Sequence, residues 1–238
     1  MAQPVAPVHD FHSHTYLTDG ALSPVELIRR AAVAGYVTLG ITDHAGIGDL
    51  QRLITTLKAD RDAVRDAWPE IEVWIGVELT HLPPALIPNA AYRARELGAE
   101  LVNVHGETPV EPTAPGTNAA AARCELVDIL VHPGLITPED AAAAAATGVF
   151  LELTFGRGHS LANGHVAKTA LTAGANLLVN SDGHVPDGLL NAQRARMIAR
   201  GAGLTDEQAD QTLYQNPLRL LDRLRTKHPA GGRGLRVL

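Results

Sequence analysis

The sequence has few of the features that mark extracellular, membrane or nucleic-acid-binding proteins. Cys124 is the single cysteine among 238 residues, which excludes a disulfide framework within the chain and favours a reducing compartment. No apolar run reaches the roughly 18 residues that suggest a membrane-spanning helix. The N-terminal residues also lack the basic and apolar regions of a signal peptide. The sequence therefore predicts a cytoplasmic protein without a membrane partner.

Basic charge and several common motifs are scarce as well. Lys and Arg total 20 against 26 Asp and Glu, which gives a net charge of −6. Proteins built around nucleic-acid backbones usually have a basic surface, so nucleic acid is not an expected partner. The chain contains no Gly-x-Gly-x-x-Gly or P-loop motif and no Gly-x-Ser-x-Gly elbow. These absences argue against the corresponding nucleotide sites and against a serine nucleophile of that type.

The sequence does contain a regular alternation of short apolar runs and helical segments. Such runs are typical of parallel strands that are covered on both faces. We expect seven strands, at Val8–Phe11, Thr38–Thr42, Val73–Leu79, Leu101–Val104, Ile129–Val131, Val149–Thr154 and Asn176–Asn180.

Helix signals fill the intervals between these runs. Ser23-Pro24-Val25-Glu26 predicts a capping box with proline at the first helical position, and Thr137-Pro138-Glu139-Asp140 opens a helix in the same way. Thr205-Asp206-Glu207-Gln208 begins a C-terminal helix. Glycines suited to left-handed C-caps lie at Gly35, Gly98, Gly148 and Gly174. The pattern predicts one α/β barrel over residues 1–238, with C-terminal helices over about 189–226 and a Gly-rich tail at 227–238.

Every predicted strand carries an imidazole or a carboxylate at or near its C-terminal end. The carboxyl ends of parallel barrel strands share one rim, where the chemistry of such barrels takes place. Ligand-type side chains that end every strand therefore predict a metal site there. They are His12 and His14, Asp43 and His44, Glu78, His105, His132, Glu152, and Asp182 with His184.

Several further residues allow two interpretations. Glu152 is embedded in an apolar strand, where an unpartnered carboxylate would be costly, so it would bind a metal or support a ligand. Asp43 would either orient the His44 ring or only form a turn. His81, His159 and His165 would either reach the mouth of the barrel or lie on surface loops.

As a set, the motifs at these positions resemble the PHP (polymerase and histidinol phosphatase) family. The resemblance covers residues 10 to 184, and its motifs occur in the order typical of that family: DFHSHTYLTDG, GITDH, GVELT, NVHGE, LVHPG and NSDGH. It implies a distorted (β/α)7 TIM-like barrel and a centre of three divalent metal ions, which would be zinc, manganese or iron.

The resemblance also implies which residues would hold each ion. The first ion would be held by His12, His14, Glu78 and Asp182, with Glu78 bridging to the second. The second would be completed by His105 and His132. The third would be held by His44 and His184 with Asp19. Glu78, His105 and Asp182 are the expected catalytic residues among them.

Such a centre favours hydrolysis of a small phosphorylated substrate, most simply a phosphate monoester. A zinc ion can bring the pKa of a bound water to about 7, which supplies a nucleophile at neutral pH. Arg157, just after the sixth strand, and His159 are the expected substrate contacts, because a guanidinium can bind phosphate through two hydrogen bonds.

Three alternatives remain open at this point. The same metals would serve a phosphodiesterase or nuclease, and amidohydrolase barrels also open with His-x-His after the first strand. Many amidohydrolases, however, use a carboxylated lysine after a middle strand, where this chain has His105. The third alternative is a metal-binding regulatory module without activity, although degenerate copies usually lose ligands and this set has no evident gap. The sequence fixes neither the substrate nor the oligomeric state.

Overall fold

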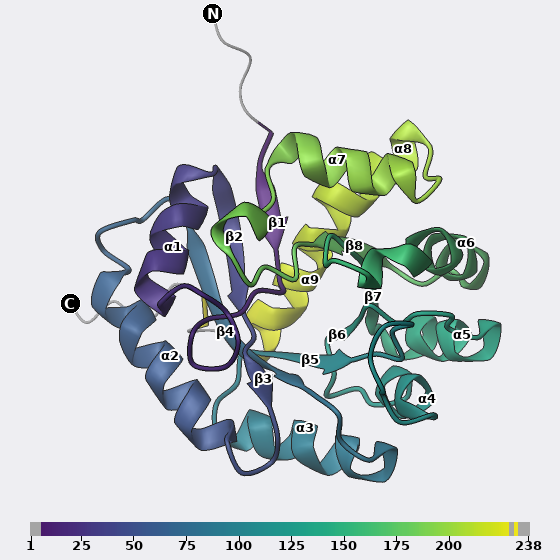
Figure 1. The fold of residues 1–238 in the computed structure, drawn as a ribbon, viewed down its shortest axis with the longest axis horizontal. Coiled ribbons are helices and arrows are strands. Elements are labelled where there is room, and N and C mark those ends of the chain that lie inside the picture. Colours follow the sequence, from purple (N-terminus) through teal and green to yellow (C-terminus); the bar gives the residue numbers. More distant parts are fainter. Residues whose placement is uncertain (1–5, 229–230, 233–238) are drawn as a thin grey trace, which may run out of the picture.

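The protein is described by a computed structural model that covers residues 6–228 and 231–232. Seven parallel strands form a sheet that is nearly closed into a barrel, in the order β1-β2-β4-β5-β6-β7-β8 (Figure 1). A short additional strand, β3 (His44–Ala45), pairs with β4 outside this order. The seven strands are β1 (Val8–Asp10), β2 (Tyr36–Ile41), β4 (Glu72–Leu79), β5 (Leu101–His105), β6 (Ile129–Val131), β7 (Phe150–Thr154) and β8 (Leu177–Asn180). The predicted α/β TIM-like barrel is confirmed, and each predicted strand matches an observed one within about two residues.

The barrel closes between β1 and β8 through a few bonds rather than a full ladder. Ser13 and Gly183 form an isolated parallel bridge. The backbone N–H of Phe11 donates to Asn180 Oδ1 at 2.9 Å, and the N–H of Ser181 donates to Asp10 Oδ1 at 3.1 Å. Side-chain acceptors therefore replace backbone carbonyls at these two positions, whereas the N–H of His14 donates to the carbonyl of Gly183.

Helices surround the strands in Figure 1 and alternate with them along the chain. They are α1 (Pro24–Val33), α2 (Leu50–Val64), α3 (Ile87–Glu96), α4 (Thr117–Ala122), α5 (Pro138–Thr147), α6 (Asn163–Ala173), α7 (Ala192–Gly201), α8 (Asp206–Asp210) and α9 (Asn216–Lys227). Short 3-10 turns occur at Pro84–Leu86, His159–Ala162 and Pro186–Gly188, and a π-helix at Gln211–Gln215 joins α8 to α9.

The predicted helix ends are observed, with one correction. Thr137 Oγ1 accepts from the N–H of Asp140, and Thr205 forms a complete capping box with Gln208. Ser23 Oγ accepts from the N–H of Glu26, but the predicted capping box is only half formed, because the Glu26 carboxylate accepts from Arg30 one turn later. The four glycines predicted to end helices all have positive φ, between 74° and 91°.

Helix α9 closes the N-terminal end of the barrel. Its side chains bond to residues at or just before the starts of strands: Asn216 Nδ2 donates to Leu177 O, and Arg223 donates to the carbonyls of Gly148 and Val127. A cluster of buried apolar residues fills the barrel against it, and burying one such leucine contributes about 1.5–3 kcal/mol. This inner cluster contains Phe11, Trp74, Leu101, Ile129, Val131, Phe150 and Leu178 with Leu220, Leu221 and Leu224 of α9.

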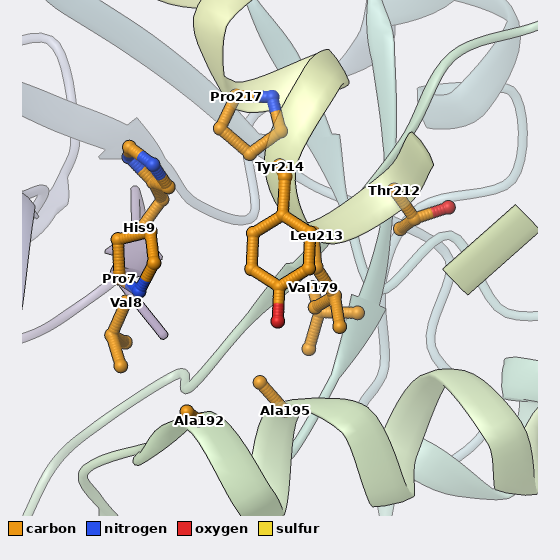
Figure 2. Close-up of a pocket in the computed structure, with 10 residues that line it drawn as sticks. All are labelled: Pro7, Val8, His9, Val179, Ala192, Ala195, Thr212, Leu213, Tyr214 and Pro217. Carbon is orange, nitrogen blue, oxygen red and sulfur yellow. The ribbon is translucent and has the colours of Figure 1, made fainter. Parts of the chain in front are cut away.

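A small pocket lies away from the rim. The pocket in Figure 2, lined by Val8, His9, Ala195 and Tyr214 among others, measures about 10 Å³, which is room for about one water molecule. Residues 229–230 and 233–238 of the predicted tail lie outside the described residues.

Among the described helices, none is both long enough and apolar enough to cross a membrane.

Candidate metal centre

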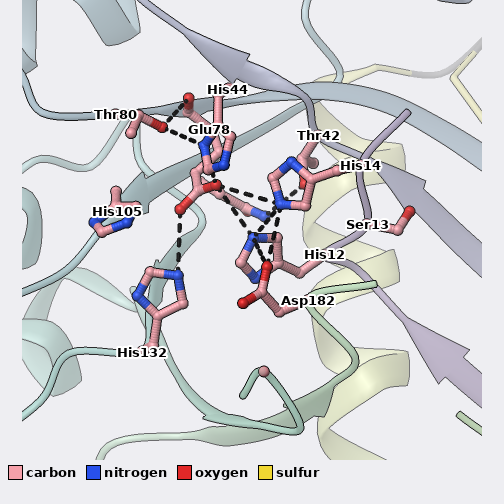
Figure 3. Close-up of polar contacts among 12 residues, drawn as sticks. His12, Ser13, His14, Thr42, His44, Glu78, Thr80, His105, His132 and Asp182 are labelled. Atoms are coloured by element: carbon pink, nitrogen blue, oxygen red, sulfur yellow. Dashed lines mark hydrogen bonds and ion pairs between the residues drawn. The ribbon is translucent and has the colours of Figure 1, made fainter. Parts of the chain in front are cut away.

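All nine residues predicted as metal ligands lie at or just beyond the C-terminal ends of the strands, around one mouth. Figure 3 shows Glu78 of β4 between His132 on one side and the His12–His14 pair on the other. Three of the nine are partly or fully exposed, namely Asp19, His44 and His184. The other six are buried, at 0–8% exposure: His12, His14, Glu78, His105, His132 and Asp182.

Glu78 is the centre of the cluster. Its Oε2 lies 3.3 Å from His12 Nε2, 3.5 Å from His14 Nε2 and 2.9 Å from His44 Nδ1, and its Oε1 lies 3.4 Å from His132 Nε2. One carboxylate thus faces four imidazoles from three different strand ends. Its two oxygens point toward different groups of rings, as a carboxylate that bridges two ions would require.

Asp182 faces the same pair of rings from the opposite side. Its Oδ1 lies 3.5 Å from His12 Nε2 and 3.3 Å from His14 Nε2, and these two nitrogens are 3.0 Å apart. Four ligand atoms therefore converge on one small volume.

A third group lies nearer to solvent. Asp19 Oδ2 is 3.4 Å from His44 Nε2 and 3.2 Å from His184 Nε2. His14 joins this group, since its ring stacks on that of His184 with centroids 4.1 Å apart. Asp19 reaches the group from the loop after β1, which Asp43 holds in place by accepting hydrogen bonds from Thr15 and Thr18. Asp43 thus bonds this loop, and the hydrogen-bond partner of the His44 ring is Thr80 instead.

Glu152 supports a ligand from within the barrel. Its Oε1 accepts from His12 Nδ1 at 2.8 Å and from Asn180 Nδ2 at 2.9 Å, and its Oε2 accepts from the N–H of His132 at 2.9 Å. A hydrogen bond at Nδ1 fixes the imidazole tautomer and directs Nε2 toward the cluster, as partners of metal-binding histidines do.

The electrostatics of the cluster keep its carboxylates ionised. Burial alone would raise the pKa of Glu78, but His44 and His12 hold the pKa of that carboxyl well below its usual range. Burial likewise opposes the charge on Asp182, whose pKa the rings of His12 and His14 lower. Burial lowers the pKa of His14 and of His105 to about 4, so both rings are neutral at pH 7 and can offer a lone pair.

The backbone is strained where two of these residues leave their strands. His132 follows β6 with φ of 28°, and Asp182 follows β8 with φ of 52°. Side chains other than glycine rarely adopt this region, and such strain persists mainly at functional sites. Gly156 makes room for Asp182, because a Cβ at position 156 would lie 2.3 Å from Asp182 Oδ2.

A pocket of about 580 Å³ opens beside Asp182 and His184. Arg157 and His159, the predicted substrate contacts, both line it. Arg157 is exposed and forms no ion pair among the described residues, whereas His159 Nε2 lies 3.9 Å from Asp182 Oδ2. His165 lies in helix α6 and does not belong to the mouth, since its Nε2 bonds the carbonyl oxygen of Ile136.

Glu111 was missed by the sequence analysis, and His81 was left undecided. Glu111 lies in the connection between β5 and α4, and its carboxylate approaches His81, His105 and His159. Its acidic side chain in a long connection after a ligand-bearing strand was the available signal, but loop geometry could not be read from the sequence.

The donor set fits divalent cations. Besides the groups described, His12, His132 and Asp182 lie together, as do Glu78, His105 and His132. Glu78 Oε1 is buried and, apart from the ion-pair contact with His132 Nε2 at 3.4 Å, has no hydrogen-bond partner among the described residues; a buried anionic oxygen is costly unless a cation or donor meets it. Mixed imidazole and carboxylate ligands suit zinc, manganese or iron. Which residues bind an ion remains a prediction.

Comparison with known proteins identifies the family. The model of the PHP domain matches residues 9–113. An uncharacterized protein of Methanocaldococcus jannaschii is 44% identical over 215 residues, which cover 90% of this chain and 99% of that protein. This chain belongs to the PHP family. Within the matched PHP segment lie His12, His14, Asp19, His44, Glu78 and His105, whereas His132, Asp182 and His184 follow it.

Solved structures share the fold of this PHP protein at low sequence identity. A chain of archaeal ribonuclease P, solved with mature tRNA, is 14% identical with a TM-score of 0.67 and covers 92% of this chain and 93% of that one. A histidinol phosphate phosphatase from Lactococcus lactis, complexed with zinc, L-histidinol and phosphate, is also 14% identical, with a TM-score of 0.53 over 84% of this chain and 95% of that one. At such identities the likeness concerns the fold alone.

Proposed function

We propose that this PHP protein is a metal-dependent phosphatase that releases phosphate from a small phosphorylated molecule. The observation that carries the proposal is the convergence of nine imidazole and carboxylate side chains on one rim, with ligand atoms 2.9–3.5 Å apart across several contacts. Tetrahedral coordination at 2.0–2.1 Å puts ligand atoms about 3.3 Å apart. This spacing supports the proposal.

The proposed ligand sets follow from this arrangement. Glu78 faces two groups through its two oxygens, so it is the proposed bridge between two ions. The sets are His12, His14, Glu78 and Asp182 for the first ion; Glu78, His105 and His132 for the second; and Asp19, His44 and His184 for the third.

The residues of the chain would prepare the site for a phosphate ester. Divalent ions bound there would activate water as a nucleophile and neutralise charge that develops on the phosphoryl group. Glu152 holds the His12 ring in the orientation that ligation needs. Arg157 projects beside the pocket at Asp182, where its guanidinium would bind phosphoryl oxygens through charge-assisted hydrogen bonds. His159, next to Asp182, is the second proposed substrate contact.

The direct test is phosphate release by the metal-loaded protein. L-Histidinol phosphate is the first substrate to try, because the histidinol phosphate phosphatase that shares this fold contains L-histidinol and phosphate. We expect turnover with manganese or zinc, and its loss both with a chelator and in the His105→Ala variant.

The outcome also separates the alternatives. If no monoester in a broad panel of sugar phosphates, nucleotides and amino alcohol phosphates releases phosphate, the proposal is wrong. Cleavage of small phosphodiesters or amides by the same loaded protein would then point to another hydrolase of this metal-dependent class. Stoichiometric metal without any hydrolysis would point to a binding module.

A further inference from the structure

A second group of metal-type side chains lies at the mouth, outside the sets assigned above except for one shared ring. His105 Nε2 is 2.9 Å from Glu111 Oε2, and His81 Nε2 is 3.3 Å from the same oxygen. The rings of His81 and His105 have centroids 4.7 Å apart. We call His81, His105 and Glu111 the outer group, and Glu78, His105 and His132 the inner group.

The connection between β5 and α4 holds Glu111 over the mouth. Glu107 Oε1 accepts from the N–H groups of Gly116 and Asn118, which closes the base of this connection. Its far side meets the loop after β7, where Thr108 Oγ1 bonds His159 Nδ1 at 2.7 Å and a Cβ at Gly158 would lie 3.1 Å from Val110 Cγ1. The Glu111 carboxylate is thus placed by a loop that is bonded at both sides of the mouth.

The outer group has the composition of a metal site. Two imidazoles and one carboxylate form recurrent zinc and iron(II) sites that leave further positions open. Their ligand atoms have the spacing expected around one ion. His105 Nδ1 bonds Gly106 O at 3.2 Å, which leaves Nε2 as the ligating atom. Among the described residues, no lysine or arginine pairs with Glu111. His81 adopts a strained φ of 54°, which points to a functional constraint on its position.

The two groups differ mainly in their access to solvent. The side chains of His81 and Glu111 are 42% and 39% exposed, whereas those of Glu78, His105 and His132 are 0–2% exposed. An ion in solution therefore meets the outer group first. Because one imidazole nitrogen binds one ion at a time, His105 can serve only one group at any moment.

We propose that the outer group is a divalent-cation capture site, from which ions pass to the inner group through the shared His105. During the transfer His105 would remain bound while Glu111 and His81 are exchanged for Glu78 and His132. A buried metal cluster needs such a path from solvent. The proposal concerns metal loading and does not depend on which bond the enzyme hydrolyses.

Metal uptake by the metal-free protein tests the proposal without any measurement of activity. Zinc is mixed with protein in a stopped-flow instrument, and free zinc is followed with a chromophoric chelator. Final metal content is then measured by elemental analysis. We expect Glu111→Gln and His81→Asn to take up zinc at least about tenfold more slowly than the wild type. Both variants should reach the wild-type metal content, since the inner ligands are untouched. Asparagine suits position 81 because it tolerates positive φ.

The matched control is Asp187→Asn, which removes an exposed carboxylate from the other side of the mouth. It measures how much any lost negative charge slows the approach of a cation. Loading of Glu111→Gln at the rate of Asp187→Asn would overturn the proposal. A lower final metal content in Glu111→Gln would also overturn it, because the outer group would then be a permanent site.

Discussion

Both ends of the barrel bury carboxylates, but the two ends neutralise them differently. At the N-terminal end Asp128 is fully buried and pairs with Arg95, with Lys227 at 3.2 Å and with Arg223 at 3.6 Å. Glu100 pairs with Arg61 at 2.6 Å at the same end. These carboxylates have permanently charged partners that the fold itself supplies.

At the C-terminal end the buried carboxylates face imidazoles. Among the described residues, no lysine or arginine lies within ion-pair distance of Glu78, Glu152 or Asp182. Burial lowers the pKa of His14 and His105 to about 4, whereas the neighbouring carboxylates, against the effect of burial, raise the pKa of His12 well above its usual value and that of His44 to about 10. The carboxylates at the N-terminal end thus have permanent cationic partners, whereas those at the C-terminal end face imidazoles, which can exchange a proton for a divalent cation. In α/β barrels the N-terminal face typically serves stability and the C-terminal face chemistry, and the two ends of this barrel differ in the same sense.

The largest predicted effect comes from Glu78→Gln, at the C-terminal end of the barrel. Loss of the bridging carboxylate should lower kcat/KM by about 10³-fold or more and reduce the bound metal. Stability of the metal-free protein should fall as well at pH 7, because His44 and His12, against the effect of burial, lower the pKa of Glu78 and the ionised carboxylate therefore stabilises the fold. Kinetics, elemental analysis and urea unfolding measure the three quantities.

Glu100→Gln is the matched control for that variant, since the same chemical change falls at the other end. It should leave metal content and activity at wild-type levels while lowering stability. Equal metal loss in both variants would contradict the distinction between the two ends.

Asp128→Asn should give the largest change in stability. Removal of one partner from a buried charge cluster costs about 3–5 kcal/mol, because Arg95 and Arg223 remain behind without their anion. The free energy of unfolding in urea measures the loss. A change below about 1 kcal/mol would mean that the cluster behaves as an exposed ion pair.

Acid should remove the stabilising contribution of the Asp128 carboxylate from the wild-type protein. Burial alone would raise the pKa of Asp128, but Arg95, Lys227 and Arg223 lower it below its usual value of 3.8. A carboxyl group with a lowered pKa stabilises the fold fully above its unfolded pKa and loses this effect as the pH falls through its folded pKa. The stability difference between wild type and Asp128→Asn should therefore narrow below about pH 4. A difference that stays constant down to pH 2 would contradict the assignment.

Glu152→Gln should have an intermediate effect on metal binding. The carboxylate accepts from His12 Nδ1, and loss of such a supporting bond typically weakens metal affinity about 10–100-fold. Competition with a chelator of known affinity measures this change. Wild-type metal affinity in the variant would show that the hydrogen bond between Glu152 and His12 does not support metal binding.

Arg157→Ala should give the smallest effect, which should concern the reaction with substrate and not the binding of metal. Loss of a charge-assisted hydrogen bond of about 1.5–3 kcal/mol should lower kcat/KM about 10–100-fold with metal content unchanged. Arg65→Ala is the control, because Arg65 lines a pocket of about 480 Å³ at the N-terminal end. Identical kinetics for the two variants would remove Arg157 from the site.

The sequence revealed most of the barrel because its signals are local. Apolar runs such as those at Leu101 and Leu177 need only short windows, and Thr137 or Gly148 fixes a helix end within a few residues. The rim could be predicted because parallel strands must end on one side, whatever their exact register. The two-residue β3 has no such signal, since it depends on contact with β4.

Contacts between segments that are distant in the sequence explain which features could not be predicted. Glu152 bonds His12 across 140 positions, and Glu111 reaches His81 and His159 only through the path of its loop. The same limit applies within one helix. The Glu26 carboxylate could accept from the backbone N–H of Ser23 or from the Arg30 side chain, and in the structure it accepts from Arg30. Spacing predicts which residues share a rim but not which of them touch.

The most direct test of the account is the metal content of the purified protein after dialysis, measured together with its thermal unfolding before and after chelation. We predict more than one zinc, manganese or iron ion per chain in the wild type and a marked loss in Glu78→Gln. Chelation should lower Tm, because a ligand at a thousand times its Kd adds about 4 kcal/mol to the folded state. A protein that retains less than one ion per chain and keeps the same Tm with chelator would contradict the metal centre itself.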